Sequence, residues 1–311
     1  MLSTQSSVAT STRDIEFLQR SISLILALTK QLDSLSLIDT LFLRLFRSRL
    51  VYHACMYEVH HKQGLEINQA ADGKQLLFRQ IVEKPWQAKD SNEPAQIVVE
   101  SFLSQKPMTQ AIEGKRTKYL IFPIVPSSGK VGHALELQAI DVRAVHNFLA
   151  GNVISVFTNL LKIFENMERD PLTGLYNKQC LEVSLIRYAQ HALTCANDAN
   201  RMDEKEWLAF IKITPKVDDN LEQLQILFGQ QMLKTFRNTD LVFRFAENEF
   251  VVLLVCNEEQ GVNSAVDRLT QVINSSDNEQ LHTLTISMAC AQFIDSASVK
   301  NTINNARLSL T

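Results

Sequence analysis

The stretch Arg169-Asp170-Pro171-Leu172-Thr173-Gly174-Leu175-Tyr176-Asn177 decides how the second half of the chain is interpreted. It follows a segment with helical apolar periodicity, and an aspartate before proline ends a helix because that position is pushed out of the α region. Thr173-Gly174 predicts a turn, and Asn177 can serve as the N-cap of a helix over residues 178–191. The stretch therefore predicts a sharp boundary between a long helix and a further domain.

The string DPLTGLYN within this stretch is similar to the opening segment of the GGDEF domain, the diguanylate cyclase family. The resemblance covers about residues 168–311, and it implies a βαβ nucleotidyl-cyclase-like fold and phosphoryl transfer assisted by Mg²⁺. The remaining elements follow the family's order: a strand over 207–213, a helix over 221–236, hairpin strands over 240–245 and 250–255, a strand over 284–291 and a closing helix over 299–308.

The family signature Gly-Gly-Asp/Glu-Glu-Phe is altered here to Ala246-Glu247-Asn248-Glu249-Phe250. The resemblance implies that two carboxylates hold the metal, one at the third signature position and one at the end of the first strand. Asn248 and Lys212 occupy these positions. Mg²⁺ prefers anionic oxygens, and a lysine ammonium repels it. We therefore expect no catalytic residue, no metal and no cofactor here, and we expect Lys212 to pair with Glu249.

Two further departures affect the nucleotide site that the resemblance implies. The signature glycines let the backbone approach the nucleotide, whereas Ala246 and Glu247 add side chains. The loop after the first strand is also short, since Asp218-Asp219-Asn220 runs almost directly into the next helix. A different alignment of the first strand makes Asp218 or Asp219 a metal ligand, but it restores neither the glycines nor the acid at position 248.

An arginine and an aspartate precede the signature, in Arg237-Asn238-Thr239-Asp240. The resemblance implies that this RxxD pair is the site that binds cyclic di-GMP, with Arg268 as an additional arginine from the later helix. The chemistry is sound, because an arginine fork pairs with guanine O6 and N7, and a carboxylate accepts from N1–H and N2–H. A three-residue spacing at a helix end places both side chains on one side of a turn.

Structural roles for the same residues stay open. Asp240 can cap the turn into the next strand, and Arg237 can be a solvated residue favoured by the helix dipole. Arg244 alternates with Phe243 and Phe245 along a strand, so we interpret it as a surface or structural residue rather than a ligand.

The first half of the chain indicates a mixed domain. Apolar periodicity predicts helices over residues 15–31 and 35–50, the second with Ser34 or Ser36 as N-cap. Residues rich in β-branched and aromatic types predict a strand over 51–60. Apolar runs over 119–125 and 131–139, joined by Pro126-Ser127-Ser128-Gly129-Lys130, predict a hairpin.

A long helix is predicted over residues 143–168, after this domain. The order of the elements in the domain, with this helix at its end, resembles that of GAF-type sensor domains. The apolar spacing 4, 3, 4, 3 predicts the seam of a homodimeric coiled coil, although a helix that packs on its own domain has the same spacing. Phe148, Leu149, Ile154 and Leu161 support that alternative at the N-terminal end. We favour a helix that docks on the first domain and then continues as a dimer seam into the second. The seam consists of Val153, Phe157, Leu160, Phe164 and Met167.

We therefore expect an α/β (α+β) protein with four parts. These are a flexible tail (1–14), a GAF-like domain with a central antiparallel sheet (15–142), a linking helix (143–169) and a degenerate GGDEF domain (170–311).

Composition narrows the class of partners. The chain has 311 residues and a formal net charge of −3, which argues against binding to a nucleic-acid polymer. Its five scattered cysteines, none at C-x-x-C spacing, predict reduced thiols in the cytoplasm. No apolar run reaches the length of a membrane span, so we expect no membrane insertion. His53, His60 and His61 have no clustered metal-ligating partners in the sequence.

The sequence thus predicts a catalytically inactive receptor for cyclic di-GMP that signals to an unknown protein effector. A pure interaction and dimerisation module is the alternative, and an active diguanylate cyclase is the third possibility.

Overall fold

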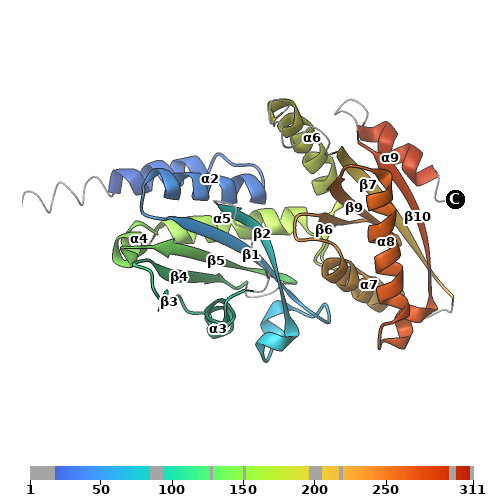
Figure 1. The fold of residues 1–311 in the computed structure, drawn as a ribbon, viewed down its shortest axis with the longest axis horizontal. Helices are drawn as coiled ribbons and strands as arrows, with labels where there is room; N and C mark the ends of the chain where they lie inside the picture. Colours follow the sequence, from blue (N-terminus) through green and yellow to red (C-terminus); the bar gives the residue numbers. More distant parts are fainter. Residues whose placement is uncertain are drawn as a thin grey trace, which may run out of the picture. The chain divides into compact units, whose positions relative to one another are not determined.

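A computed structural model of the chain describes residues 18–84, 94–126, 129–149, 152–195, 205–216, 220–293 and 299–308. The expected tail over residues 1–14 lies outside them. Two compact units are present, one made of Met1–Val59 and Ile67–Met167 and the other of His60–Glu66 and Glu168–Thr311. Both units are mixed α/β structures with one five-stranded sheet each (Figure 1).

The first unit is built on a sheet with strand order β2-β1-β5-β4-β3. One face packs on the helix Leu18–Leu28 and on α2, α4 and α5, and the other face packs on α3. The predicted hairpin is confirmed as the antiparallel pair β4–β5. The elements are α2 (Ser34–Arg47), β1 (His53–His61), the 3-10 helices Ile67–Gln69 and Gly73–Gln75, β2 (Leu76–Lys84), α3 (Gln96–Ser104), β3 (Met108–Ala111), β4 (Lys118–Ile124), β5 (Val131–Ala139), α4 (Val142–Leu149) and α5 (Asn152–Glu168).

The N-cap of α2 is Asp33, so the prediction of Ser34 or Ser36 is wrong. The Asp33 carboxylate accepts a hydrogen bond from the Ser36 backbone N–H at 2.8 Å and another from the Ser36 hydroxyl at 2.8 Å. Ser34 is buried instead. Aspartate and serine are equally good N-caps, so composition alone does not choose between adjacent candidates.

The expected single helix over residues 143–168 is two helices, α4 and α5, bent by 60°. Ala150-Gly151 separates them in the sequence, and glycine is a poor helix former because it loses the most backbone freedom. Among the described residues no single helix is long and apolar enough to span a membrane. Only α4 and α5 taken together reach that length and composition.

The predicted dimer seam along α5 lies mostly in the core of the first unit. Phe157 is fully buried and Val153 and Phe164 are nearly so, with Leu160 packed against the same cluster. Only Met167 is exposed, at 62%. The spacing therefore reflects a helix that faces the core of its own unit. The homodimer remains a prediction, but these buried residues do not support it.

The second unit has the strand order β10-β7-β9-β8-β6. Strand β9 lies between β7 and β8 and is antiparallel to both, so β7 and β8 run parallel and α7 connects them as the helix of a split βαβ unit. The predicted elements are confirmed with ends shifted by a few residues. These are α6 (Lys178–Cys195), β7 (Lys205–Pro215), α7 (Leu221–Thr235), β8 (Leu241–Ala246), β9 (Glu249–Cys256), β10 (Leu284–Gln292) and α9 (Val299–Leu308). The unit also contains β6 (Tyr176–Asn177), α8 (Glu259–Asn274) and the 3-10 helix Glu279–Thr283.

The stretch that opens this unit forms the predicted turn. The Gly174 backbone N–H donates to the Asp170 carbonyl at 2.8 Å, and Gly174 has φ +75°, a conformation that favours glycine. One Asp170 carboxylate oxygen accepts from both the backbone N–H and the hydroxyl of Thr173 at 2.8 Å. The Asn177 side chain accepts from the Cys180 N–H at 3.0 Å, so the predicted N-cap of α6 is confirmed.

Candidate functional site

The altered signature forms the tight connection between β8 and β9. Glu247 and Asn248 make the turn, and the Asn248 carbonyl accepts a hydrogen bond from the Ile213 backbone N–H of β7 at 3.0 Å. In the register between β7 and β9, Lys212 lies directly opposite Glu249. The fold therefore brings together the two chain positions at which the resemblance places metal-binding carboxylates.

The Glu249 carboxylate is held by the closing helix rather than by Lys212, which corrects our expectation. Arg307 of α9 places its Nε 2.7 Å from Glu249 Oε2 and donates from Nη2 to Oε1 at 3.1 Å. The same guanidinium lies 5.6 Å from the centre of the Phe245 ring, which Lys178 approaches from 4.7 Å. Glu249 is thus already neutralised by a cation.

The Asn248 side chain belongs to a polar network that reaches back to the opening turn. Its Oδ1 accepts from Gln225 Nε2 of α7 at 3.1 Å. The other end of the Gln225 amide accepts from Arg244 Nη2 at 2.7 Å, and Arg244 Nη1 donates to Asp170 Oδ2 at 2.9 Å. Gln225 is 1% exposed. Arg244 therefore has a structural role, which is one of the two roles that we predicted for it, whereas no local pattern indicated Gln225.

The donors around this turn do not fit a magnesium site. The carboxylate of Glu249 is paired with Arg307, the amide oxygen of Asn248 accepts from Gln225, and Lys212 adds a positive charge. In the part of the chain that the structure describes, no three His, Cys, Asp or Glu side chains are placed to hold a metal ion together. Glu247 is exposed on the turn. We derive no metal-dependent step here.

The loop after β7 is described only in part. Asp218 and Asp219, the alternative ligands, lie outside the described residues. Asn220 is the N-cap of α7, and its side chain accepts from the Gln223 backbone N–H at 3.3 Å. A capping oxygen is committed to the helix end, so Asn220 acts structurally here.

The RxxD residues form a compact turn between α7 and β8. Asp240 Oδ2 accepts from the Arg237 backbone N–H at 2.8 Å, and the Asp240 N–H donates to the Arg237 carbonyl at 3.0 Å. Asp240 is 7% exposed, whereas the Arg237 side chain is exposed. The capping role that we considered for Asp240 is therefore present, and the arginine is the member of the pair that faces solvent.

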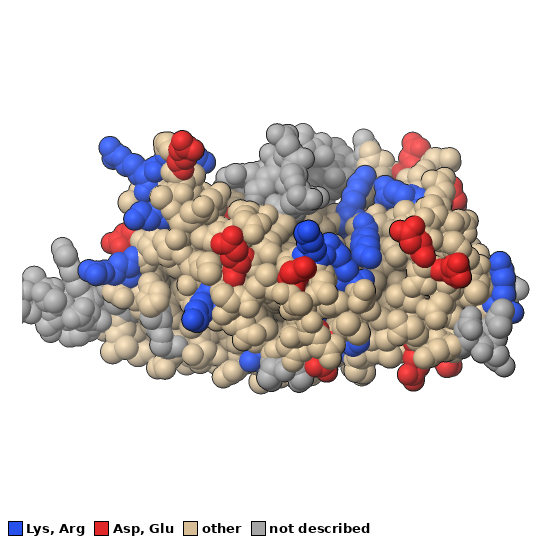
Figure 2. All heavy atoms as spheres, turned by 90° about the horizontal axis from the view of Figure 1, so that it is seen from below, with Lys and Arg blue, Asp and Glu red and all other residues tan. Residues whose placement is uncertain are grey.

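Arg268 lies on the exposed side of α8, and α8 packs against α7. Cys256, at the end of β9, is close to the RxxD turn, because its thiol interacts electrostatically with both Asp240 and Arg237. Burial raises the pKa of the Cys256 thiol. Figure 2 shows acidic and basic side chains interspersed on the face in view.

A buried polar cluster in the first unit escaped the sequence analysis. His53 Nε2 lies 2.8 Å from Glu83 Oε1, with both side chains 2% exposed, and Tyr57 donates to Glu136 Oε2 at 3.3 Å. Burial, followed by the charges of Cys55 and Glu136, raises the pKa of Tyr57 above its ordinary value, so this hydroxyl stays protonated. His53 interacts with two carboxylates that lie 30 and 83 positions further along the chain, which no local pattern indicates.

Cys290 gives a prediction that depends on a pKa. Burial, and then the hydrogen bond from its thiol to Glu259 Oε1 at 3.2 Å, raise the pKa of Cys290 to about 11. The thiolate is the reactive form, so alkylation by iodoacetamide near neutral pH is expected to be slow and to accelerate about tenfold per pH unit towards pH 11. Glu259→Gln is expected to increase the rate at fixed pH, as measured by peptide mass spectrometry. An unchanged rate in this variant would contradict the assignment.

Comparisons with known proteins find similarity only at the level of solved structures. No protein-family model matches the chain, and no curated protein sequence matches it. The GGDEF domain of FimX from Pseudomonas aeruginosa is 19% identical and covers 46% of this chain and 93% of its own, with a TM-score of 0.38. The coiled coil and GGDEF domain of DgcB from Caulobacter crescentus, solved in complex with c-di-GMP, is 17% identical and covers 51% and 86%, with a TM-score of 0.39.

The diguanylate cyclase SiaD, solved with its activator SiaC from Pseudomonas aeruginosa, is 20% identical. It covers 48% of this chain and 59% of its own length, with a TM-score of 0.38. Identities and TM-scores of this size carry no argument about ligands or activity, so the interpretation of the site depends on the residues described above. What these comparisons establish is a set of solved GGDEF-domain structures to which about half of this chain is similar.

Proposed function

We propose that this chain is a degenerate member of the diguanylate cyclase family that binds cyclic di-GMP through Arg237, Asp240 and Arg268 and does not synthesise it. The single observation that supports this most is the pairing at the altered signature. Lys212 lies opposite Glu249, and Glu249 is paired with Arg307. Two cations therefore stand beside the position where synthesis needs magnesium, and magnesium neutralises the developing phosphoryl charge.

The retained ligand site is supported by the exposure of its arginine. Arg237 is an exposed residue at the end of α7, and its turn is fixed by two hydrogen bonds between Arg237 and Asp240. A planar guanidinium on a fixed turn is well suited to pair with O6 and N7 of a guanine base. Asp240, mostly buried, orients this turn.

The proposed receptor acts in the cytoplasm on a protein effector, and the GAF-like first unit is its sensory input. The second candidate is an interaction module without a nucleotide ligand. The observation that favours it is the capping role of Asp240, since a buried carboxylate that accepts from its own turn has less capacity for a ligand.

Calorimetric titration of the full chain with cyclic di-GMP distinguishes the two. We expect saturable binding that Arg237→Ala weakens by at least about tenfold, because hydrogen bonds to charged groups contribute about 1.5–3 kcal/mol each. Lys216→Ala, which removes an exposed cation at the end of β7, is the matched control and is expected to bind as the unmodified chain does. In Asp240→Asn the side-chain oxygen still accepts from the Arg237 N–H, so this variant tests what the negative charge of Asp240 contributes to binding.

Absence of heat, together with an unchanged melting temperature in excess cyclic di-GMP, would favour the interaction module, because a ligand of the native state must raise stability. In a separate assay, incubation with GTP and Mg²⁺ or Mn²⁺ is expected to give no cyclic di-GMP. Measurable product would overturn our interpretation of Lys212 and Asn248.

A further inference from the structure

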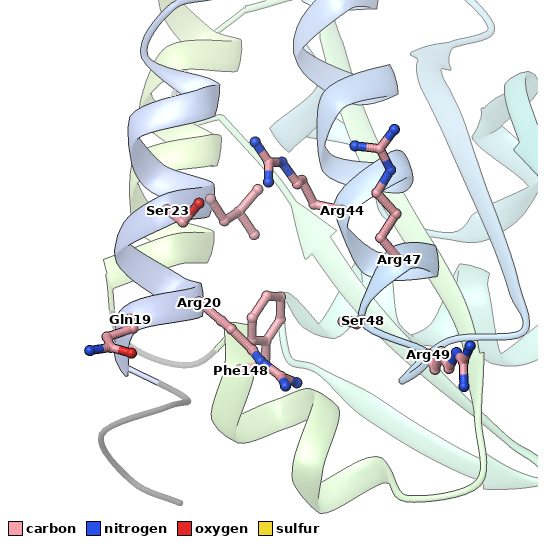
Figure 3. Close-up of a pocket in the computed structure, with 9 residues that line it drawn as sticks. Gln19, Arg20, Ser23, Arg44, Arg47, Ser48, Arg49 and Phe148 are labelled. Carbon is pink, nitrogen blue, oxygen red and sulfur yellow. The ribbon is translucent and has the colours of Figure 1, made fainter. Parts of the chain in front are cut away.

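A pocket of about 600 Å³ lies in the first unit, between the helix Leu18–Leu28, the C-terminal end of α2 and α4. This volume is in the range of small-molecule sites in proteins. Figure 3 shows Arg44 extending from α2 toward the helix that carries Ser23, and Arg20 running beside the Phe148 ring. The nine lining residues are Gln19, Arg20, Ser23, Leu24, Arg44, Arg47, Ser48, Arg49 and Phe148.

The charge of this pocket is one-sided. Four of its nine lining residues are arginines and none is acidic. Among the residues that the structure describes, no ion pair or hydrogen bond engages the four guanidinium groups, in contrast to Arg244 and Arg307, which both hold carboxylates. Four cations around one concavity repel each other at close range. The pocket therefore gathers positive charge from four side chains, of which Arg44 is half-buried and the other three are exposed.

The backbone at the end of α2 adds an independent observation. Arg49 has φ +57°, in the left-handed region that usually takes glycine after a helix. Its N–H donates to the Phe46 carbonyl at 2.9 Å, so the conformation is fixed by the helix end. A bulky cationic residue where glycine is the favoured choice breaks a local rule, and such positions concentrate at functional sites. The Arg49 side chain is one of those that line the pocket.

The helix dipole alone does not account for the arrangement. The negative C-terminal end of α2 stabilises Arg44 and Arg47, which lie in its last turn. It offers no reason for Arg20, which comes from another helix. Leu24 and the Phe148 ring supply an apolar wall beside the cations, and Ser23 and Ser48 supply hydroxyl groups. Cations, hydroxyl groups and an apolar wall in one pocket suit an organic phosphate.

We propose that this pocket binds a phosphate ester that carries at least two negative charges, either as a free metabolite or as the headgroup of a phosphorylated lipid. Guanidinium forks match phosphate oxygens in geometry, and their hydrogen bonds to phosphate are charge-assisted. The site lies in the other unit from Arg237, so it does not depend on the proposed cyclic di-GMP function.

Inorganic pyrophosphate is the probe for the free form, titrated into the full chain at constant ionic strength. Saturable binding and a rise in melting temperature are expected. The variant Arg44→Gln with Arg47→Gln is expected to weaken binding by at least about tenfold. Lys115→Gln with Arg116→Gln removes two exposed cations elsewhere in the unit and is expected to bind as the unmodified chain does. Arg20→Gln, at an exposed position, keeps the test valid if the double variant fails to fold.

The lipid source is tested by measuring how much of the chain binds to vesicles. Phosphatidylcholine vesicles that contain phosphatidic acid are compared with vesicles that contain phosphatidylserine at the same mole fraction. Arginine-dependent binding of pyrophosphate, or arginine-dependent preference for phosphatidic acid, supports the proposal and identifies the source. The proposal is overturned if neither probe binds, or if the arginine variants bind as the unmodified chain does. Arg237→Ala is expected to keep pyrophosphate binding, so failure at one site is distinguished from failure at the other.

Discussion

Replacing Phe157 by alanine is expected to cost the first unit about 3–5 kcal/mol of its free energy of unfolding. The ring is fully buried in the core between the sheet and its covering helices, so its removal loses buried apolar surface and leaves a cavity. Because the chain has two units, a single melting curve does not isolate this effect. Hydrogen exchange of peptides from β4 and β5, compared with peptides from β8 and β9, measures it locally.

Met167→Ala is the matched control on the same helix, at a position in phase with Phe157. Met167 is 62% exposed, so its truncation is expected to change stability by no more than about 0.5 kcal/mol. If α5 were instead a dimer seam along its whole length, both variants would shift the monomer–dimer equilibrium in sedimentation experiments. A concentration-dependent loss of stability in both variants would contradict the core assignment.

Replacing Asp170 by alanine is expected to destabilise the second unit by about 3 kcal/mol. Its carboxylate accepts from Thr173 twice and from Arg244 once, and the Arg244 and Asp170 side chains are only 16% and 15% exposed. The substitution therefore leaves a mostly buried guanidinium without its anion and releases the opening turn. Chemical denaturation followed by tryptophan fluorescence in a Trp86→Phe background, in which Trp207 of β7 is the remaining tryptophan, measures the loss.

The matched experiment is a double-mutant cycle with Arg244→Met. If the two side chains act as a pair, the double variant Asp170→Ala with Arg244→Met is expected to be more stable than the sum of the single losses predicts. Strictly additive losses would show that Arg244 and Asp170 contribute independently.

The sequence predicts local features of this molecule well. The turn from Asp170 to Gly174, the cap at Asn177 and the hairpin β8–β9 all depend on residues close together in the chain, and each is present. The boundaries of the strands in the second unit differ from the predictions by only a few residues.

Contacts between distant residues were the ones that escaped prediction. Lys212 and Glu249 are neighbours across two strands as expected, but Arg307 reaches the carboxylate from a helix 58 residues later. Similarly, nothing local brings Arg20 of one helix to the same pocket as Arg44 of the next. Which distant residues come into contact is decided by tertiary packing, and the spacing of residues along the chain does not indicate it.

The α5 seam shows a different limit, because two structures share one pattern. A spacing of four and three places apolar residues on one stripe of a helix, whether that stripe faces a second copy or a sheet of the same domain. Phe157 and Phe164 face the core of their own unit. Only the three-dimensional packing distinguishes these alternatives.

The network from Asp170 through Arg244 and Gln225 to Asn248 has a consequence for substitutions at position 248. A mutation that placed aspartate at position 248 would set a carboxylate beside the Gln225 amide, on the turn next to the Lys212–Glu249 pair of strand neighbours. The new oxygen atoms would meet groups that are already in place, so this single substitution is not sufficient to create a free metal ligand.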